Sequence, residues 1–165
     1  MSALFWAMFT GGSMIDKEEI FSIMPHRGRM LLLSRITGYD LNERVIEAEY
    51  DVTNECLFYD SSAAGVPAWV GFEFIAQSIA AFSGIRDRAK GKPPQIGFVL
   101  AVSKLCMELS FFKPGSIITI KAKEIENMCP VYVFEGEIFL DGKKALGGKL
   151  TVIEVDNETE KGLIK

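Results

Sequence analysis

Apolar and polar residues alternate along several stretches of the chain, and a period of two is typical of β-strands with one buried face. The first clear stretch covers residues 44–52, where Ala48 and Tyr50 alternate with Glu47 and Glu49. The charged side chains would lie in solvent while the apolar ones enter a core. This pattern predicts a strand in a sheet that has one wet face.

The second half of the chain predicts an almost continuous series of strands. They cover residues 95–112, 116–125, 131–140 and 144–155. The first of these can bend near Ser103, and Asp141 with Gly142 is a strong hairpin signal. Gly147 and Gly148 indicate a bulge or a close approach of another backbone. We therefore expect mainly antiparallel pairing.

The most apolar segment, residues 63–85, predicts a helix because it is long and rich in alanine. We expect the helix to continue to about Ala89, with Val66 as its N-cap and Pro67 at its first position. It is apolar on nearly every side, so it should be buried on nearly every side. A membrane span is the rival interpretation, which the many predicted strands disfavour.

These elements predict one α+β domain over residues 14–155. A short helix is expected within residues 15–24, with Asp16 as its N-cap. A sheet with one apolar face must cover that face, and only one helix is long enough to do so. We therefore expect a curved antiparallel sheet wrapped around one long central helix. Residues 1–13 and 156–165 are interpreted as tails.

Composition narrows the function. The chain has 165 residues and a net charge of −4, which argues against nucleic-acid binding. Cys56, Cys106 and Cys129 are scattered and lack metal-ligand spacing with His26, so we expect no metal site. We expect the three thiols to be reduced and to lie in the core of a cytoplasmic protein. The apolar residues 1–13 are too few for a membrane span and lack the basic start of a signal peptide.

Glu73 is the main candidate for chemistry, because a carboxyl group inside an apolar helix is costly to bury without a partner. In such surroundings it tends to keep its proton and can act as an acid. Gln77 lies one turn later on the same face and can bind Glu73 or a ligand. The alternative is a structural carboxylate that is satisfied by a backbone N–H or a lysine.

The start of this helix is the second candidate. Val66 has no side-chain oxygen to cap it, so the N–H of Ala68 is expected to be free to receive an anion or a polarised carbonyl. A carbonyl from elsewhere in the fold is the equally weighted alternative.

The remaining candidates are cationic or ionisable. His26 is the only histidine, and a lone histidine is more often a packed or capping residue. Arg86, Arg88, Lys90 and Lys92 lie at the helix end, where cations are favoured and face water. They could also dock an acidic carrier protein or the phosphates of coenzyme A.

Two segments resemble a known family. Residues 24–36, MPHRGRMLLLSRI, are similar to the N-terminal signature of hotdog-fold 3-hydroxyacyl-[acyl-carrier-protein] dehydratases. Residues 65–77, GVPAWVGFEFIAQ, resemble the central helix of that family. Within the family, their sequence is most similar to that of the dehydratase-like subunits of aryl-polyene-type gene clusters. The likeness covers about residues 16–155.

The resemblance implies a hotdog fold and a dimer, homodimer or heterodimer, with its sites at the subunit interface. It implies no cofactor beyond the pantetheine of an acyl carrier protein or coenzyme A, which carries the acyl thioester. The family removes water from a 3-hydroxyacyl thioester. By this resemblance Glu73 is the acid and the N–H of Ala68 holds the thioester carbonyl.

The chain departs from the family at the position of the usual catalytic histidine. That residue lies in an H-F-P-G motif fourteen positions before the acid, where this chain has Tyr59. His26 matches the other histidine of the family, in the N-terminal signature. Three functions follow: a dehydratase that uses His26 as its base, a thioesterase that uses Glu73, or a non-catalytic partner of an active dehydratase.

The predicted site consists of two catalytic and four substrate-binding residues. The catalytic residues are Glu73 and His26, and the substrate-binding residues are Tyr59, Pro67, Ala68 and Gln77.

Overall fold

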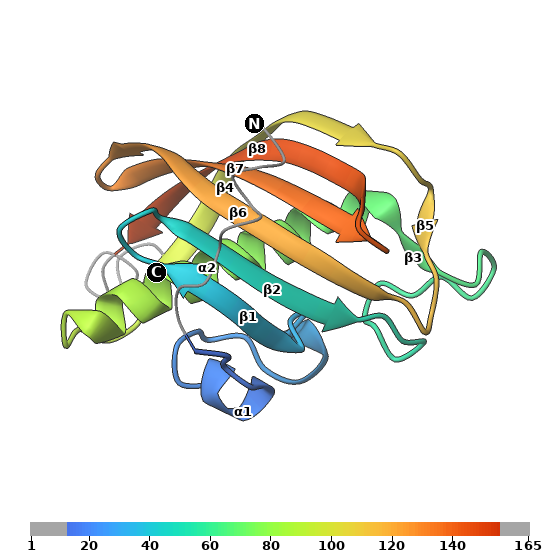
Figure 1. Cartoon of the computed structure of the whole chain (residues 1–165), viewed down its shortest axis with the longest axis horizontal. Helices are drawn as coiled ribbons and strands as arrows, with labels where there is room; N and C mark the ends of the chain where they lie inside the picture. The colour runs from blue at the N-terminus through green and yellow to red at the C-terminus, as the bar shows by residue number, and fades with distance from the viewer. Residues whose placement is uncertain (1–12, 156–165) are drawn as a thin grey trace, which may run out of the picture.

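A computed structural model describes residues 13–155 of the chain. The two predicted tails, 1–13 and 156–165, lie outside the described residues except for Ser13, which is exposed. Within these residues a six-stranded main sheet surrounds one long helix (Figure 1), and the single domain over residues 14–155 stays a prediction.

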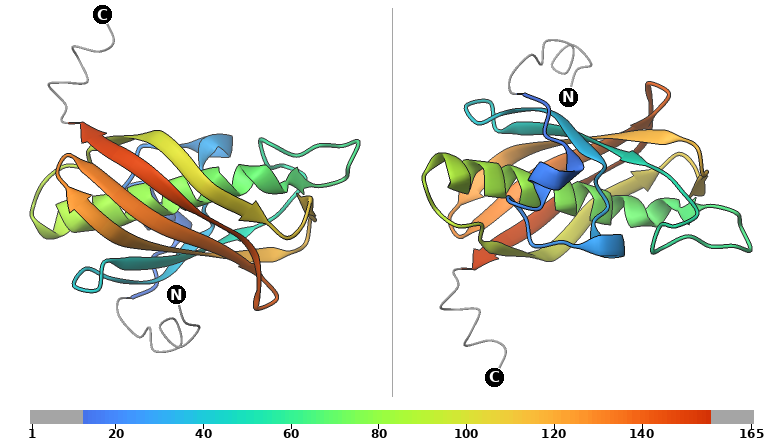
Figure 2. Two further views of the ribbon diagram at one scale, coloured as in Figure 1. Left: turned by 90° about the horizontal axis from the view of Figure 1, so that it is seen from above. Right: turned by 90° about the horizontal axis from the view of Figure 1, so that it is seen from below.

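Six antiparallel strands form the main sheet, in the order β1-β2-β6-β7-β8-β4. Their bounds are β1 Arg35–Asp40, β2 Val45–Asp51, β4 Ile96–Met107, β6 Ile117–Met128, β7 Val131–Leu140 and β8 Lys143–Val155. The sheet curves around the helix α2, Gly71–Ala89, which runs across its concave face (Figures 1 and 2). The predicted α+β hotdog arrangement is thereby confirmed.

The smaller elements lie at the ends of the helix and on its far side. A two-stranded sheet pairs β3, Val66–Pro67, with β5, Phe111–Phe112. The N-terminal segment carries α1, Lys17–Ile20, and the 3-10 turn Gly28–Met30. Figure 2 shows this segment crossing α2 on the side that the sheet leaves open. The helix is therefore covered from both sides.

The hairpin between β7 and β8 follows the sequence pattern closely. Alternate residues of β7 are buried, and the turn residues Asp141 and Gly142 both have positive φ, at 50° and 74°. Two consecutive positive φ angles are what a two-residue hairpin requires. Both strands and the turn were predicted within one residue of their observed bounds.

The bend expected near Ser103 is also present. Lys104 has a φ of 53°, and the pairing of β4 with β8 shifts register between Ser103 and Cys106. The bulge brings Leu105 against β8, where a Cβ on Gly148 would lie 3.1 Å from Leu105 Cδ1. The close approach predicted from the paired glycines is therefore real.

Near the N-terminus and at the start of α2, two of three elements differ from the prediction. Strand β1 was not predicted, because this short edge strand is interrupted by a register shift between Ile36 and Gly38 and shows no long alternation. The short helix predicted within residues 15–24 is confirmed: it is four residues long, and Asp16 caps it as expected through the N–H of Glu19. The N-cap expected at Val66 is incorrect, because β3 and a 3-10 turn, Ala68–Val70, precede α2.

Helix α2 is the core of the molecule. Ala68–Ala89, which includes the preceding turn, is long and apolar enough to cross a membrane, yet 72% of its most apolar window is buried inside the fold. Two glycines allow close packing around it. A Cβ on Gly84 would lie 1.8 Å from the carbonyl oxygen of Ile23, and a Cβ on Gly136 of β7 would lie 2.4 Å from Ile75 Cγ2.

We expect Gly84→Ala to destabilise the fold by about 3 kcal/mol, because its methyl group would collide with rigid backbone rather than with a movable side chain. Urea denaturation of the full chain measures this change. Gly97→Ala is the matched control, since its new Cβ would lie 3.6 Å from the nearest atom, in ordinary contact. Equal stability of the two variants would contradict the packing described.

Candidate active site

A cavity of about 230 Å³ lies along one face of α2. The helix lines it from Glu73 to Ser83, strand β4 contributes Phe98 and Val99, and the N-terminal segment contributes His26. We call this space the central cavity. Its walls are mostly apolar, and the sequence pattern of the helix places Glu73 one turn before Gln77 on this face.

Glu73 is half-buried at the wall of the central cavity. Its Oε1 accepts a hydrogen bond from Gln77 Nε2 at 2.9 Å. The expectation that Gln77 can bind Glu73 is therefore confirmed, and the carboxylate also lines a cavity. A carboxyl group in this position can exchange a proton with a bound ligand.

Gln77 joins Glu73 to the N-terminal segment. Its side chain is 1% exposed, and Nε2 also donates to the carbonyl of Met30 at 2.8 Å. Its Oε1 accepts from the N–H of Leu32 at 2.7 Å. Both amide hydrogens are therefore used within the protein, so Gln77 acts as a positioning residue for Glu73, and its predicted contact with substrate stays a prediction.

His26 lines the same cavity as Glu73, within the same chain. Its Nδ1 is buried and has no hydrogen-bond partner among residues 13–155. Burial lowers the pKa of His26, while the carboxylate of Glu73 raises it and Arg27 lowers it further. The imidazole is therefore kept neutral, as a general base must be.

The start of the helix differs from the prediction. The N–H of Ala68 donates to the carbonyl of Ser110 at 2.8 Å, so the amide is not free, and the alternative of a carbonyl from elsewhere in the fold is confirmed. The cause is the pairing of β3 with β5, which places the carbonyl of Ser110 beside this turn. Pro67 lies in β3 and is half-buried, and its contact with substrate stays a prediction.

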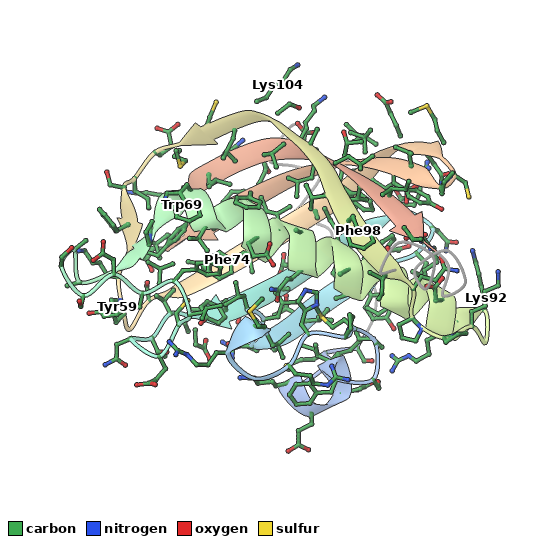
Figure 3. All side chains as sticks on the ribbon, turned by 180° about the vertical axis from the view of Figure 1, so that it is seen from behind. Tyr59, Trp69, Phe74, Lys92, Phe98 and Lys104 are labelled. Atoms are coloured by element: carbon green, nitrogen blue, oxygen red, sulfur yellow. The ribbon has the colours of Figure 1, made fainter. Side chains whose placement is uncertain are left out.

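Tyr59 lies away from the central cavity of its own chain. It lines a separate open hollow with Arg35 and Ser116. Figure 3 shows Tyr59 near Trp69 at one end of α2, whereas Phe98 of the central cavity lies farther along the helix. The fold therefore brings His26, Glu73 and Gln77 together and leaves Tyr59 apart from them.

Sequence reasoning missed the wall that β4 contributes. Phe98 and Val99 belong to the apolar run FVLAV, which does not alternate with polar residues. A strand that is apolar on both faces needs cover on both faces. This run was the available signal that β4 borders a cavity or an interface.

The cysteines and acids give no metal site within residues 13–155, where no cluster of three or more metal-ligating side chains occurs. Cys56 is buried as expected, but Cys106 and Cys129 are exposed, so the expectation of a core position is wrong for two of the three. Cys106 lies on β4 and Cys129 in the turn between β6 and β7, where side chains point to solvent.

Comparisons with known proteins agree with this geometry. Residues 18–163 match the family described as ApeP-like, ApeP dehydratase. The 3-hydroxyacyl-[acyl-carrier-protein] dehydratase FabZ of Chlamydia trachomatis serovar L2 is 32% identical over 112 residues, which cover 64% of this chain and 70% of that protein. FabZ of Clostridium acetobutylicum is 26% identical over 142 residues, 84% of this chain and 96% of that protein.

Solved structures show the same fold. The dehydratase heterocomplex ApeI:P from Xenorhabdus doucetiae matches with a TM-score of 0.80 and 21% identity, over 88% of this chain and 97% of that chain. A hypothetical thioesterase from Streptococcus pneumoniae, solved with coenzyme A, matches with a TM-score of 0.53 and 15% identity, over 68% and 80%. With the family match over most of its length, this hotdog chain belongs to the ApeP-like dehydratases.

Proposed function

We propose that the chain binds a 3-hydroxyacyl thioester in the central cavity and takes part in its dehydration to the 2-enoyl thioester. The observation that carries this proposal is the presence of Glu73 and His26 in the wall of one largely apolar cavity. An acid and a base beside an apolar channel are what an elimination from an acyl chain needs.

In this reaction a base removes a proton from C2, next to the thioester carbonyl. Glu73 gives a proton to the hydroxyl group on C3, which leaves as water. The C2–H and C3–O bonds break and the C2–C3 double bond forms. Gln77 holds Oε1 of Glu73, which leaves the other carboxyl oxygen for the substrate.

Two sources of the base are compatible with the site. His26 is neutral and lies in the same cavity as Glu73. The alternative is a histidine of a second hotdog subunit, because this chain has Tyr59 where the resembling family has its catalytic histidine. In that case the chain contributes Glu73 and the partner contributes the base.

A partner subunit is supported by the exposed edge of the sheet. Strand β4 is an edge strand, and its apolar residues Phe98, Leu100 and Val102 are 46%, 57% and 37% exposed. A long apolar edge invites pairing with another strand. Because Phe98 also lines the central cavity, a second subunit on β4 would complete its wall. We propose a homodimer, or a heterodimer with another hotdog subunit, at this edge.

The thioester is proposed to arrive on the pantetheine of an acyl carrier protein or of coenzyme A, with no further cofactor, in the cytoplasm. Two of the four cations at the end of α2 are engaged within the chain: Arg86 pairs with Glu154, and Arg88 with Glu19 at 2.8 Å. Lys90 and Lys92 are exposed and remain candidates for contact with an acidic carrier.

A thioesterase is the second candidate, because a carboxylate alone can activate water against a thioester and this chain lacks the H-F-P-G histidine. Release of free thiol from acyl-coenzyme A of several chain lengths tests it. Thiol release that depends on Glu73, with no enoyl product, would favour the thioesterase over the dehydratase.

We expect Glu73→Gln to lower the rate of 2-enoyl thioester formation at least about 100-fold, because an amide cannot deliver a proton to the leaving hydroxyl. The enoyl absorbance of a 3-hydroxyacyl-pantetheine reaction, with any co-purifying subunit present, measures this rate. Melting temperature should change little, since the amide oxygen of the variant can still accept from Gln77. Glu43→Gln, in an exposed turn, is the control. Unchanged turnover in Glu73→Gln would refute the proposal.

The pH profile separates the two sources of the base. If His26 is the base, kcat/KM should fall as the pH drops through its pKa, because protonation removes the base. Burial lowers that pKa, so the fall should lie below pH 6.5, the ordinary value for histidine. His26→Gln should then lower kcat/KM about 100-fold and abolish this limb. An unchanged limb in His26→Gln would assign the base to the partner subunit.

Leu100→Glu should weaken the dimer at least about tenfold, because it places a charge in the centre of the apolar edge of β4. Sedimentation velocity across micromolar concentrations measures the dissociation constant. Met128→Glu, at the end of β6 and 60% exposed, is the matched control and should leave assembly unchanged. A wild-type monomer at these concentrations would contradict the proposed interface.

A further inference from the structure

The segment that carries His26 is anchored to α2 at two points, and His26 lies between them along the chain. At one point the backbone of Ile23 packs against Gly84, where a Cβ on the glycine would lie 1.8 Å from the carbonyl oxygen of Ile23. At the other point Gln77 donates to the carbonyl of Met30. Gly84 and Gln77 are about 10 Å apart along the helix axis, at the helical rise per residue. The chain between these anchors needs other contacts to hold its shape.

Arg27 supplies such contacts. Its Nη1 donates to the carbonyl oxygens of Met24 and His26 at 2.7 and 2.8 Å, and its Nη2 donates to that of Phe21 at 2.8 Å. The guanidinium carbon also lies over the ring of Phe21, 5.1 Å from its centroid. A planar guanidinium has the fixed fork of donors that this arrangement needs, and a lysine ammonium does not. One side chain therefore ties together the carbonyl groups of the turn that presents His26.

The imidazole of His26 has no anchor of its own at its buried nitrogen. Nδ1 is buried without a hydrogen-bond partner in the part of the chain that the structure describes. The backbone of the turn therefore sets the position of the ring in the wall of the central cavity, with no contribution from Nδ1. Because Glu73 lines the same cavity, a shift of the turn would change the distance between the imidazole and the carboxylate.

The charges around His26 provide a measure of that distance. Burial lowers the pKa of His26 most, the carboxylate of Glu73 raises it, and Arg27 lowers it. Glu154 is the other ionisable residue in the wall of the central cavity, and it is paired with Arg86. The interaction between two charges weakens as they separate. The effect of Glu73 on the pKa of His26 therefore reports where the imidazole lies relative to the acid.

We propose that Arg27 is a positioning residue, which holds the turn of residues 21–26 so that the imidazole of His26 stays in the same cavity wall as Glu73. The importance of this role for catalysis rests on the proposed function, in which His26 is one source of the base. The alternative is that Arg27 only closes the end of the short helix α1, where cations are favoured. Its removal would then lower stability without moving His26 relative to Glu73.

His26 is the only histidine of the chain, so NMR can follow its pKa directly and without turnover. The full-length chain is prepared with isotope-labelled histidine and without a histidine tag, and any co-purifying subunit is left unlabelled. In the wild-type background we expect Glu73→Gln to lower the pKa of His26 by about half a pH unit, because this variant lacks the carboxylate that raises it.

The same substitution is then made in the Arg27→Gln background. We expect Glu73→Gln to change the pKa of His26 there by less than about half as much, because the turn no longer holds the imidazole near the carboxylate. Arg27→Lys should also diminish the effect of Glu73→Gln, since lysine keeps the charge but lacks the planar fork. Loss of the effect in both variants therefore reports position rather than the charge of Arg27.

Arg29→Gln is the matched control. Arg29 belongs to the same exposed turn and also bonds backbone carbonyls, those of Glu55 and Cys56 at 3.1 and 3.4 Å. These carbonyls lie outside the turn that presents His26. In the Arg29→Gln background, Glu73→Gln should change the pKa of His26 as much as it does in wild type.

The outcomes separate the positioning role from the proposed function. An equal effect of Glu73→Gln in the wild-type and Arg27→Gln backgrounds would overturn the role of Arg27 and leave the proposed function intact. No effect of Glu73→Gln in wild type would also overturn it, because the imidazole would then lie out of reach of the acid. Unchanged turnover in Glu73→Gln, by contrast, refutes the proposed function alone. If Arg27→Gln does not fold, the same comparison with Arg27→Lys decides.

Discussion

Gln77 is 1% exposed, so its side chain must make its hydrogen bonds inside the protein, where the N-terminal segment crosses α2. Gln77 meets that requirement by bonding the backbone at Met30 and at Leu32 and the carboxylate of Glu73. A buried polar side chain is tolerated only when such partners are present. The side-chain amide of Gln77 therefore holds the N-terminal segment, which carries His26, against the helix. The same amide also holds the carboxylate of Glu73.

On the side of β4, α2 is not fully enclosed, and the candidate active site lies in this gap. Along β4 the sheet ends in an apolar edge, and the central cavity lies between this edge and the helix. Beside Glu73 the cavity brings a carboxyl group and the imidazole of His26 into mostly apolar surroundings. A ligand with a reactive head and a hydrocarbon chain complements these walls.

Much of the candidate site could be predicted from residue chemistry and family resemblance. Glu73 was identifiable because a carboxyl group stands out in an apolar helix, and Gln77 because it follows one turn later. For Ala68 the sequence left open whether its N–H is free, because the carbonyl that satisfies it comes from Ser110, far along the chain. Phe98 was not identified, since only the edge position of β4 places its side chain in the cavity.

The sequence by itself determined the elements whose signals are local. The alternation of β7, the turn at Asp141 and Gly142, and the apolar length of α2 depend on neighbouring residues, so they can be read along the chain. Tertiary structure alone decided that His26 shares a cavity with Glu73 and that Asp87 is buried with an unpaired oxygen. Those properties depend on which distant segments meet, and pairing of that kind is set by the packing of the whole sheet around the helix.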